Sequence, residues 1–196
     1  VANGTPYWNS SLINSKPGAD LNVDRLTLEN SETSMDAWSK LHVFAVWHWN
    51  GDTRWQYSFG KTTNVNGSTT TAWHFGLRNG NWNPPQVRSW LVNSSGSAFG
   101  HEGNQAATAS LKNNLGLLAI SYDGTNFTVR IDGTQWKTRA DVSGALQSLP
   151  TIPVALNQGH NIRFGEFVVF NDKLSSTDEQ DMEGYLAQKL APNGDL

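Results

Sequence analysis

The sequence predicts an all-β fold, a sandwich of two antiparallel sheets followed by one short helix. Three observations support this prediction. Residues 116–139 contain three strand-like runs joined by two Asp-Gly turns, many further short apolar runs are separated by turn residues, and helical periodicity recurs near the end of the chain. A meander with one apolar face requires a second sheet to cover it, and the remaining strands are expected to supply that sheet.

The central meander has the clearest pattern. Apolar side chains at Phe127, Val129 and Ile131 alternate with polar ones, which is the period of a half-buried strand. Residues 123–126 predict a four-residue hairpin loop. Asp132-Gly133 predicts a two-residue turn in which both residues have positive φ.

Strands are also expected on both sides of the meander. The run 41–49 has no glycine or proline and is apolar on both faces, so it belongs in the middle of a sheet, with Trp55–Phe59 returning as the second arm of a hairpin. Residues 1–20 are expected to be an irregular lead-in with room for one short strand, residues 93–114 mostly loop, and residues 141–149 a short helix or an irregular crossing. The remaining expected strands are 21–28, 72–77, 86–92, 151–156 and 162–170.

One helix is expected, over residues 177–190. Ser176 and Glu179 fit a capping box, in which a hydroxyl and a carboxylate three residues later satisfy amides of the first turn. Apolar residues recur at helical spacing after this box, and Pro192 follows the helix.

Length and composition limit the classes of function. The 196 residues are expected to form one domain, 1–196, which is large enough to fold without disulfides or metals, and the chain has no cysteine. A net charge of −3 without long runs of one sign argues against nucleic acid as a partner, and no apolar stretch is long enough for membrane insertion. Nine tryptophans and a charged fraction of only 16% are typical of β-rich, water-facing binding proteins.

Two blocks of sequence resemble a known family. LLAISYDGTNFTVRIDG (117–133) is similar to the strand, Tyr-Asp-Gly turn and strand of the concanavalin A-like, or laminin G-like, jelly-roll domains, and IRFGEFVVFNDKLSSTDEQDMEGYLAQKL (162–190) resembles the ending of the bacterial and phage members. The resemblance implies two curved antiparallel sheets packed face to face in a jelly roll. It leaves the function open, because this superfamily includes lectins, adhesion modules, glycoside hydrolases and polysaccharide lyases.

The sequence argues against catalysis. A glycoside hydrolase needs two carboxylates facing one cleft, and the Glu-x-Asp-x-x-Glu strand of the superfamily's hydrolases is absent. Glu166, an acid inside a predicted strand, is expected to be a hydrogen-bonded structural residue. A lyase would need a base near a neutralising arginine, and the candidates form no compact motif: His48, His74, His101 and His160, with Arg54, Arg78, Arg88 and Arg163.

The tryptophans are the most informative candidates for a binding site, because flat aromatic rings stack on the apolar faces of sugars. Trp47 and Trp90 lie within predicted strands and are expected in the core. Trp82, in the segment Asn-Gly-Asn-Trp-Asn, is the tryptophan most expected at a ligand face. The expected ligand-binding residues are Trp82, Asn81, Asn83, Trp49, Trp55 and Trp136. Alternatively, these rings cap the ends of the sandwich or pack against a neighbouring subunit.

No motif requires a cofactor. Calcium is the metal considered, since some family members bind it through loop oxygens, and the candidate ligands are Asp52, Asp141 and Asn157. We therefore expect a non-catalytic recognition module of an extracellular, cell-surface or virion protein, with a glycan or polysaccharide as the favoured partner. Two alternatives stay open: a structural decoration or appendage domain of a phage particle or surface assembly that binds protein neighbours, and a divergent polysaccharide-degrading enzyme.

Overall fold

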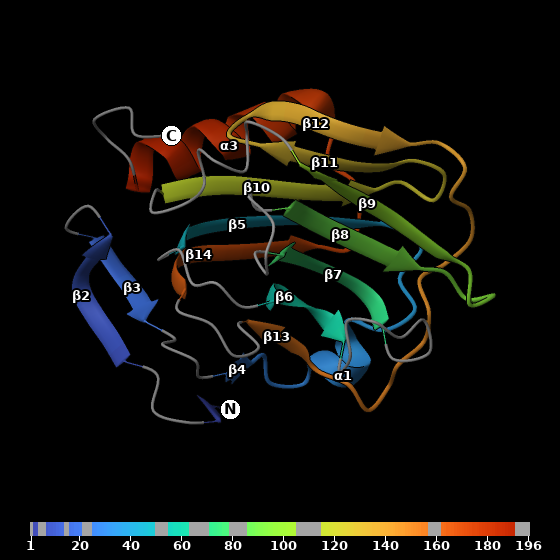
Figure 1. Cartoon of the computed structure of the whole chain (residues 1–196), viewed down its shortest axis with the longest axis horizontal. Coiled ribbons are helices and arrows are strands. Elements are labelled where there is room, and N and C mark those ends of the chain that lie inside the picture. Colours follow the sequence, from blue (N-terminus) through green and yellow to red (C-terminus); the bar gives the residue numbers. More distant parts are fainter. Residues whose placement is uncertain are drawn as a thin grey trace.

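The computed structural model describes residues 2–3, 7–13, 16–20, 25–49, 55–62, 71–78, 86–104, 115–156 and 162–190. Within these ranges, two seven-stranded antiparallel sheets pack face to face, and a C-terminal helix lies against one of them (Figure 1). The predicted two-sheet β sandwich with a short C-terminal helix is confirmed.

We call the two sheets A and B. In spatial order, sheet A contains β1 (Ala2–Asn3), β4 (Arg25–Thr27), β13 (Val154–Leu156), β6 (Trp55–Thr62), β7 (Thr71–Arg78), β8 (Gln86–Val92) and β9 (Ala98–Asn104). Sheet B contains β12 (Thr134–Arg139), β11 (Phe127–Ile131), β10 (Leu115–Tyr122), β5 (Leu41–Trp49), β14 (Ile162–Phe170), β3 (Lys16–Asp20) and β2 (Tyr7–Ile13). The helices are α1 (Ser31–Ser34) and α3 (Ser176–Leu190). Neither of these helices is both long and apolar enough to span a membrane.

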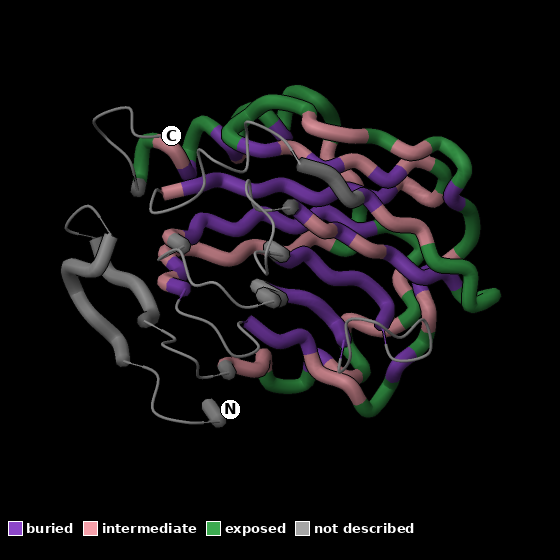
Figure 2. The backbone as a smooth tube through the Cα atoms, in the orientation of Figure 1, coloured by how far each residue is buried: buried purple, intermediate pink, exposed green. Residues whose placement is uncertain are grey.

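Aromatic side chains fill much of the core between the sheets. Trp47 of β5 packs edge-on against Phe75 of β7 with ring centroids 5.6 Å apart, and Phe59 of β6 stacks on Phe75 at 5.5 Å. All three residues are at most 1% exposed. The Trp47–Phe75 contact joins sheet B to sheet A across the interior, where the buried backbone is purple in Figure 2. The large rings bury much apolar area, which is the dominant favourable contribution to folding.

The central meander forms as the sequence predicts. β10, β11 and β12 pair antiparallel in chain order, and alternate residues of β11 are buried. Asp132 and Gly133 have φ values of 49° and 71°, as a two-residue type I′ turn requires. The 123–126 loop is closed by the Asp123 N–H, which donates to the Asn126 carbonyl at 3.2 Å.

The predicted hairpin between residues 41–49 and 55–59 is wrong. β5 lies in sheet B between β10 and β14, whereas β6 lies in sheet A between β13 and β7. β5 is apolar on both faces, and the middle of sheet B buries both of them, one against sheet A and the other against α3. The chain therefore changes sheets between β5 and β6, which gives each of these long strands two partners.

Two regions with weak hydrophobic patterning also differ from the prediction. Residues 1–20 contain β1 and the β2–β3 hairpin, and β3 extends sheet B beyond β14. Residues 93–114 contain β9, the edge strand of sheet A. These edge strands are rich in polar and small residues and lack the apolar alternation that marks a half-buried strand. The expected strand in 21–28 is β4, and residues 141–149 cross irregularly with one bridge from Leu146 to Asn93.

Candidate functional site in a polar hollow beside the C-terminal helix

The outer face of sheet B has an apolar half and a polar half. Helix α3 covers the apolar half, where its Leu186 packs against Phe44, Val46, Leu117 and Ala119. Leu186 is 0% exposed, so this part of the sheet is closed. Beyond the helix, the outward side chains of β10, β11 and β12 are polar and the surface is hollowed.

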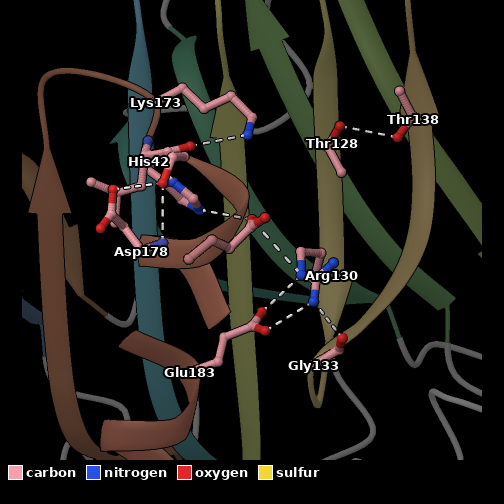
Figure 3. A network of polar contacts seen from close by, with 11 residues as sticks. His42, Thr128, Arg130, Gly133, Thr138, Lys173, Asp178 and Glu183 are labelled. Atoms are coloured by element: carbon pink, nitrogen blue, oxygen red, sulfur yellow. Dashed lines mark hydrogen bonds and ion pairs between the residues drawn. The ribbon is translucent and has the colours of Figure 1, made fainter. Parts of the chain in front are cut away.

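Two rows of paired residues form the floor of this polar hollow. In the first row, Ser121, Thr128 and Thr138 lie at matched positions across β10, β11 and β12. The hydroxyls of Thr128 and Thr138 are 3.0 Å apart (Figure 3). In the second row, Arg130 of β11 pairs with Gln135 of β12. The register shifts between the two rows, and this irregularity brings Gln135 and Thr138, three positions apart, to the same face, which a regular strand would not do.

The polar hollow has a volume of about 310 Å³, at the lower end of the roughly 300–1,000 Å³ of small-molecule sites. Lys173 precedes α3 and Glu179 lies in its first turn, so the start of the helix forms one wall. All the described residues that line the polar hollow are polar or charged. They are Ser121, Asp123, Asn126, Thr128, Arg130, Gln135, Thr138, Lys173 and Glu179.

The N-terminal cap of α3 determines whether the Glu179 carboxylate binds the helix backbone or faces the sheet. The predicted capping box of Ser176 and Glu179 is wrong by one residue. The Ser175 hydroxyl accepts a hydrogen bond from the Asp178 N–H at 3.2 Å and donates to the Asp178 carboxylate at 2.6 Å. Because Glu179 is not used in the cap, it is available to face the sheet, where it is only 7% exposed.

Arg130 is fixed from behind the polar hollow. Its Nε and Nη2 donate to the two carboxylate oxygens of Glu183 at 2.8 and 2.9 Å, and Nη2 also donates to the Gly133 carbonyl (Figure 3). A bidentate pair of this kind fixes the plane of the guanidinium group. Nη1 has no acceptor among the described residues, so its two N–H groups can bind a ligand in the polar hollow.

A buried histidine supports the wall of the polar hollow. His42 Nδ1 accepts from the Leu174 N–H at 3.3 Å, so the neutral ring carries its proton on Nε2, which lies 3.1 Å from Glu179 Oε1. Burial, together with the smaller effects of the Lys173 and Arg130 charges, lowers the pKa of His42 from 6.5 to about 3. Burial raises the pKa of Glu179 above its ordinary 4.5, against the lowering effect of Arg130 and Lys173. The ring is therefore neutral at pH 7.

Lys173 and Asn126 leave hydrogen-bonding capacity at the rim. The Lys173 ammonium donates to the Leu174 carbonyl at 3.2 Å and forms no ion pair within the described part of the chain. Two of its three N–H groups therefore remain for a ligand. The side-chain NH₂ group of Asn126 donates to Asp123 and Thr125, which leaves the side-chain oxygen Oδ1 of Asn126 as an acceptor.

Asp123 is a carboxylate used by its own turn. Its Oδ1 accepts from the N–H groups of Thr125 and Asn126 at 2.8 and 2.6 Å, and its Oδ2 accepts from the Asn126 amide at 2.9 Å. Burial acts to raise the pKa of Asp123, but the hydrogen bonds from Asn126 and Thr125 together lower it from 3.8 to about 2. The group is therefore ionised and well satisfied at neutral pH.

Among the tryptophans predicted to bind ligand, Trp136 has a described side chain, and it does not line the polar hollow. Trp82, Asn81 and Asn83 lie outside the described residues, so that prediction stays open. Trp49 is the last residue of β5 and Trp55 the first of β6, and only their backbone is described. Trp136 is half-buried and packs against the core, with its ring 6.3 Å from that of His101 and the Lys137 ammonium 4.8 Å from its centroid.

Other candidates from the sequence have structural partners. Trp47 is in the core as predicted, but Trp90 is half-buried and lies against Gly100, where a Cβ would be 2.7 Å from the indole ring. Glu166 accepts a hydrogen bond from Lys189 of α3 at 2.8 Å, as expected of a structural residue. None of the described histidines lines the polar hollow.

The described residues bring together no group of three His, Asp or Glu side chains that could hold a metal ion. Of the three calcium candidates, Asp141 pairs with Arg139. Asp52 and Asn157 lie outside the described residues. Calcium binding therefore stays a prediction.

The sequence carries little local signal for the polar hollow. Strand alternation places Thr128 and Arg130 on the polar face of β11, but Ser121, Lys173 and Glu179 join them only through strand pairing and helix docking. The one available signal is hydroxyl residues at matching positions of paired strands, and it becomes visible only when the register is known.

Comparison with known proteins gives a likeness of fold. No protein-family model matches the chain, and no curated protein matches its sequence. The binding domain of Paraclostridial Mosquitocidal Protein 1 has a TM-score of 0.68 at 10% identity, covering 95% of this chain and 47% of that chain. The binding domain of botulinum neurotoxin serotype G has a TM-score of 0.67 at 10% identity, covering 95% and 46%.

A third solved structure is the ligand-binding domain of botulinum neurotoxin serotype D in complex with N-acetylneuraminic acid. Its TM-score is 0.67 at 11% identity, covering 94% of this chain and 46% of that chain. This chain therefore spans about half the length of each of these neighbours. At such identities the likeness establishes the fold, which is a β sandwich shared with toxin binding domains.

Proposed function

We propose that the chain is a non-catalytic recognition module that binds carbohydrate, built on a concanavalin A-like jelly roll and working outside the cell, on a cell surface or on a virion. The observation that carries the proposal is the polar hollow. A row of hydroxyls lies there beside N–H donors of Arg130 and Lys173 that no described residue uses. Binding sites for small molecules such as sugars commonly contain a few polar groups that point into a concave surface.

The neighbours in fold support this proposal. They are named as binding domains, and one of them holds N-acetylneuraminic acid. The shared sandwich makes a binding role for this chain a reasonable extension, although a fold can host several functions.

The carboxylates of the polar hollow argue against hydrolysis. A glycosidase needs one carboxylic acid and one carboxylate free to act on the bond between two sugars. Here Asp123 is held by its own turn, and Glu183 pairs with Arg130 at 2.8 Å behind the floor. Glu179 is not free either, since its Oε1 lies 3.8 Å from Arg130 Nε and 3.1 Å from His42 Nε2.

A binding screen tests the proposal. The wild-type chain is offered a panel of soluble polysaccharides and oligosaccharides, once with calcium and once with a chelator, and binding to at least one glycan is expected. Thr138→Tyr, which places a bulky ring in the polar hollow on an exposed strand position, is expected to abolish that binding. Thr134→Tyr is the matched control, since Thr134 is exposed on the same strand and does not line the polar hollow.

Three results would count against the proposal. Binding that Thr138→Tyr leaves unchanged would move the site elsewhere, with the segment around Trp82 as the first alternative. Failure to bind any glycan would favour an appendage domain that holds protein neighbours. Release of sugar products from the panel would establish the enzymatic alternative. A loss of binding with the chelator would add calcium to the site.

A further inference from the structure

The polar hollow has no excess of positive charge, and the inference drawn from this rests on the proposed function. Two cations, Arg130 and Lys173, and two acids, Asp123 and Glu179, line it. Glu183 adds a carboxylate 2.8 Å from Arg130 Nε. An incoming carboxylate or sulfate would have to share Arg130 with Glu183, and it would also approach the carboxylate of Glu179. Its net electrostatic attraction would therefore be too small to offset the free-energy cost of removing its bound water.

The hydrogen-bonding groups that remain are of both kinds. The Ser121 hydroxyl can donate and accept, the Thr128–Thr138 pair keeps one donor and acceptor lone pairs after its mutual hydrogen bond, and the Gln135 amide can do both. Arg130 Nη1 and the Lys173 ammonium add donors, and the side-chain oxygen of Asn126 adds an acceptor. An ionised carboxylate or sulfate only accepts and an ammonium group only donates, whereas a sugar hydroxyl does both. This mixed set therefore fits a polyol better than an anion or a cation.

Aromatic rings are missing from the described lining of the polar hollow. A sugar therefore finds no ring there on which to stack its C–H face, and hydrogen bonds to its hydroxyl edge have to hold it. Neutral hydrogen bonds exchange with water and contribute little net free energy each, so a single sugar unit is expected to bind weakly. Several units or several copies of the chain would be needed for tight attachment.

We propose that the polar hollow binds an uncharged, hydroxyl-rich sugar unit by its hydroxyl edge and discriminates against acidic sugars. Glu179 and Glu183 are the groups that disfavour a ligand carboxylate. Ser121, Thr128, Thr138 and Gln135 are the groups that select hydroxyls.

A set of neutral glycans and a set of acidic glycans test this proposal. The neutral probes are glucan, mannan, galactan, xylan and lactose, and the acidic probes are polygalacturonate, polymannuronate, hyaluronan and sialyllactose. We expect binding of at least one neutral probe, weaker binding of every acidic probe, and a neutral affinity that is unchanged between low and high salt, since screening acts on charges.

Two variants and one control variant locate the binding and report the charge of the ligand. Thr138→Tyr is expected to abolish binding of the neutral probe, and Thr134→Tyr to preserve it. Lys173→Gln replaces a charged donor by a neutral one, so affinity for a neutral sugar is expected to fall by less than about fivefold, whereas a ligand carboxylate paired with Lys173 would lose about tenfold or more. Circular dichroism and thermal melting confirm that each variant is folded.

The outcomes separate this inference from the proposed function. Binding of acidic probes alone, with loss at high salt and on Lys173→Gln, would overturn the neutral preference and leave carbohydrate binding standing. Neutral binding that survives Thr138→Tyr would overturn the assignment to the polar hollow. No binding of any probe would overturn both.

Discussion

The two halves of the outer face of sheet B differ in their side chains and in what covers them. On the apolar half, Phe44 and Ala119 are buried beneath Leu186 of α3. On the polar half, two strands further along the same sheet, Thr128 and Thr138 carry hydroxyls at paired positions. The two halves differ in their side chains, and the polar half also contains the register shift between β11 and β12.

The difference teaches that the middle of α3 packs on the sheet, whereas its first turn lines the polar hollow. Its middle closes the sheet through Leu186, whereas its first turn presents Glu179 to the polar hollow. Glu183 lies between these positions and holds Arg130 in place. If this division is correct, substitutions in the apolar half should affect stability first, and substitutions in the polar half should affect binding first.

The largest effect is expected from the apolar half. Leu186→Ala leaves a cavity beneath α3, since Leu186 is 0% exposed, and it should lower the free energy of unfolding by about 2–5 kcal/mol. Urea denaturation measures the loss. Tyr185→Ala is the control on the same helix, because Tyr185 is 51% exposed and its removal should change stability by no more than about 0.5 kcal/mol. Equal losses from the two variants would mean that α3 does not close the sheet.

An intermediate effect is expected where the two halves meet. Arg130→Met leaves the Glu183 carboxylate without its bidentate partner, and Glu183 is only 7% exposed, so stability should fall by about 1–3 kcal/mol. Glu183→Gln and the double variant complete a thermodynamic cycle, measured by urea denaturation. Strictly additive losses in this cycle would show that the two side chains are not coupled.

Acid should weaken the structure through His42. A depressed pKa means that the folded protein resists protonation, so the stability that the neutral ring contributes is complete above pH 6.5 and is lost as the pH falls from 6.5 towards 3. One such histidine adds a slope of up to about 1.4 kcal/mol per pH unit in this window. His42→Gln should make the dependence shallower, as measured by denaturation at a series of pH values.

Two other groups bear on the same experiment. Glu179 has a raised pKa and acts in the opposite direction, since its contribution is complete below pH 4.5 and is lost as the pH rises through the folded value. His74 is buried with a pKa lowered to about 3, and it remains in the variant as an internal reference for the acid limb. An unchanged slope in His42→Gln would contradict the role assigned to His42.

The smallest effect on stability and a selective effect on binding are expected from Thr138→Val. This change removes one exposed hydroxyl, so stability should change by no more than about 0.5 kcal/mol. Affinity for the bound glycan should fall by about two- to tenfold, the value of one neutral hydrogen bond. Isothermal titration calorimetry measures this affinity. Thr134→Val is the control that should leave the affinity unchanged.

Much of the fold could be predicted because its signals are local. The Asp-Gly turns, the alternation of Phe127, Val129 and Ile131, and the helical spacing near the end of the chain each depend on neighbouring residues. The partners of β5 could not be predicted in the same way. An apolar strand is compatible with any central position, and which strands flank it depends on the packing of the whole sandwich.

The polar hollow depends on three details that a sequence hides. The irregularity between β11 and β12 turns Gln135 to the side of Thr138. The cap at Ser175, one residue earlier than predicted, leaves Glu179 available to face the sheet. Docking of α3 then places Lys173 and Glu179 beside the strand floor, as one wall of the polar hollow. Each detail is a choice between local alternatives of similar free energy, and tertiary packing decides it.

One measurement tests the central claim most directly: an amide NMR titration of the wild-type chain with the neutral glycan that binds best. We predict that the resonances of Ser121, Asn126, Thr128, Gln135 and Thr138 shift together and saturate with one dissociation constant, while those of the apolar half beneath α3 stay in place. Shifts confined to residues outside the polar hollow would contradict the account.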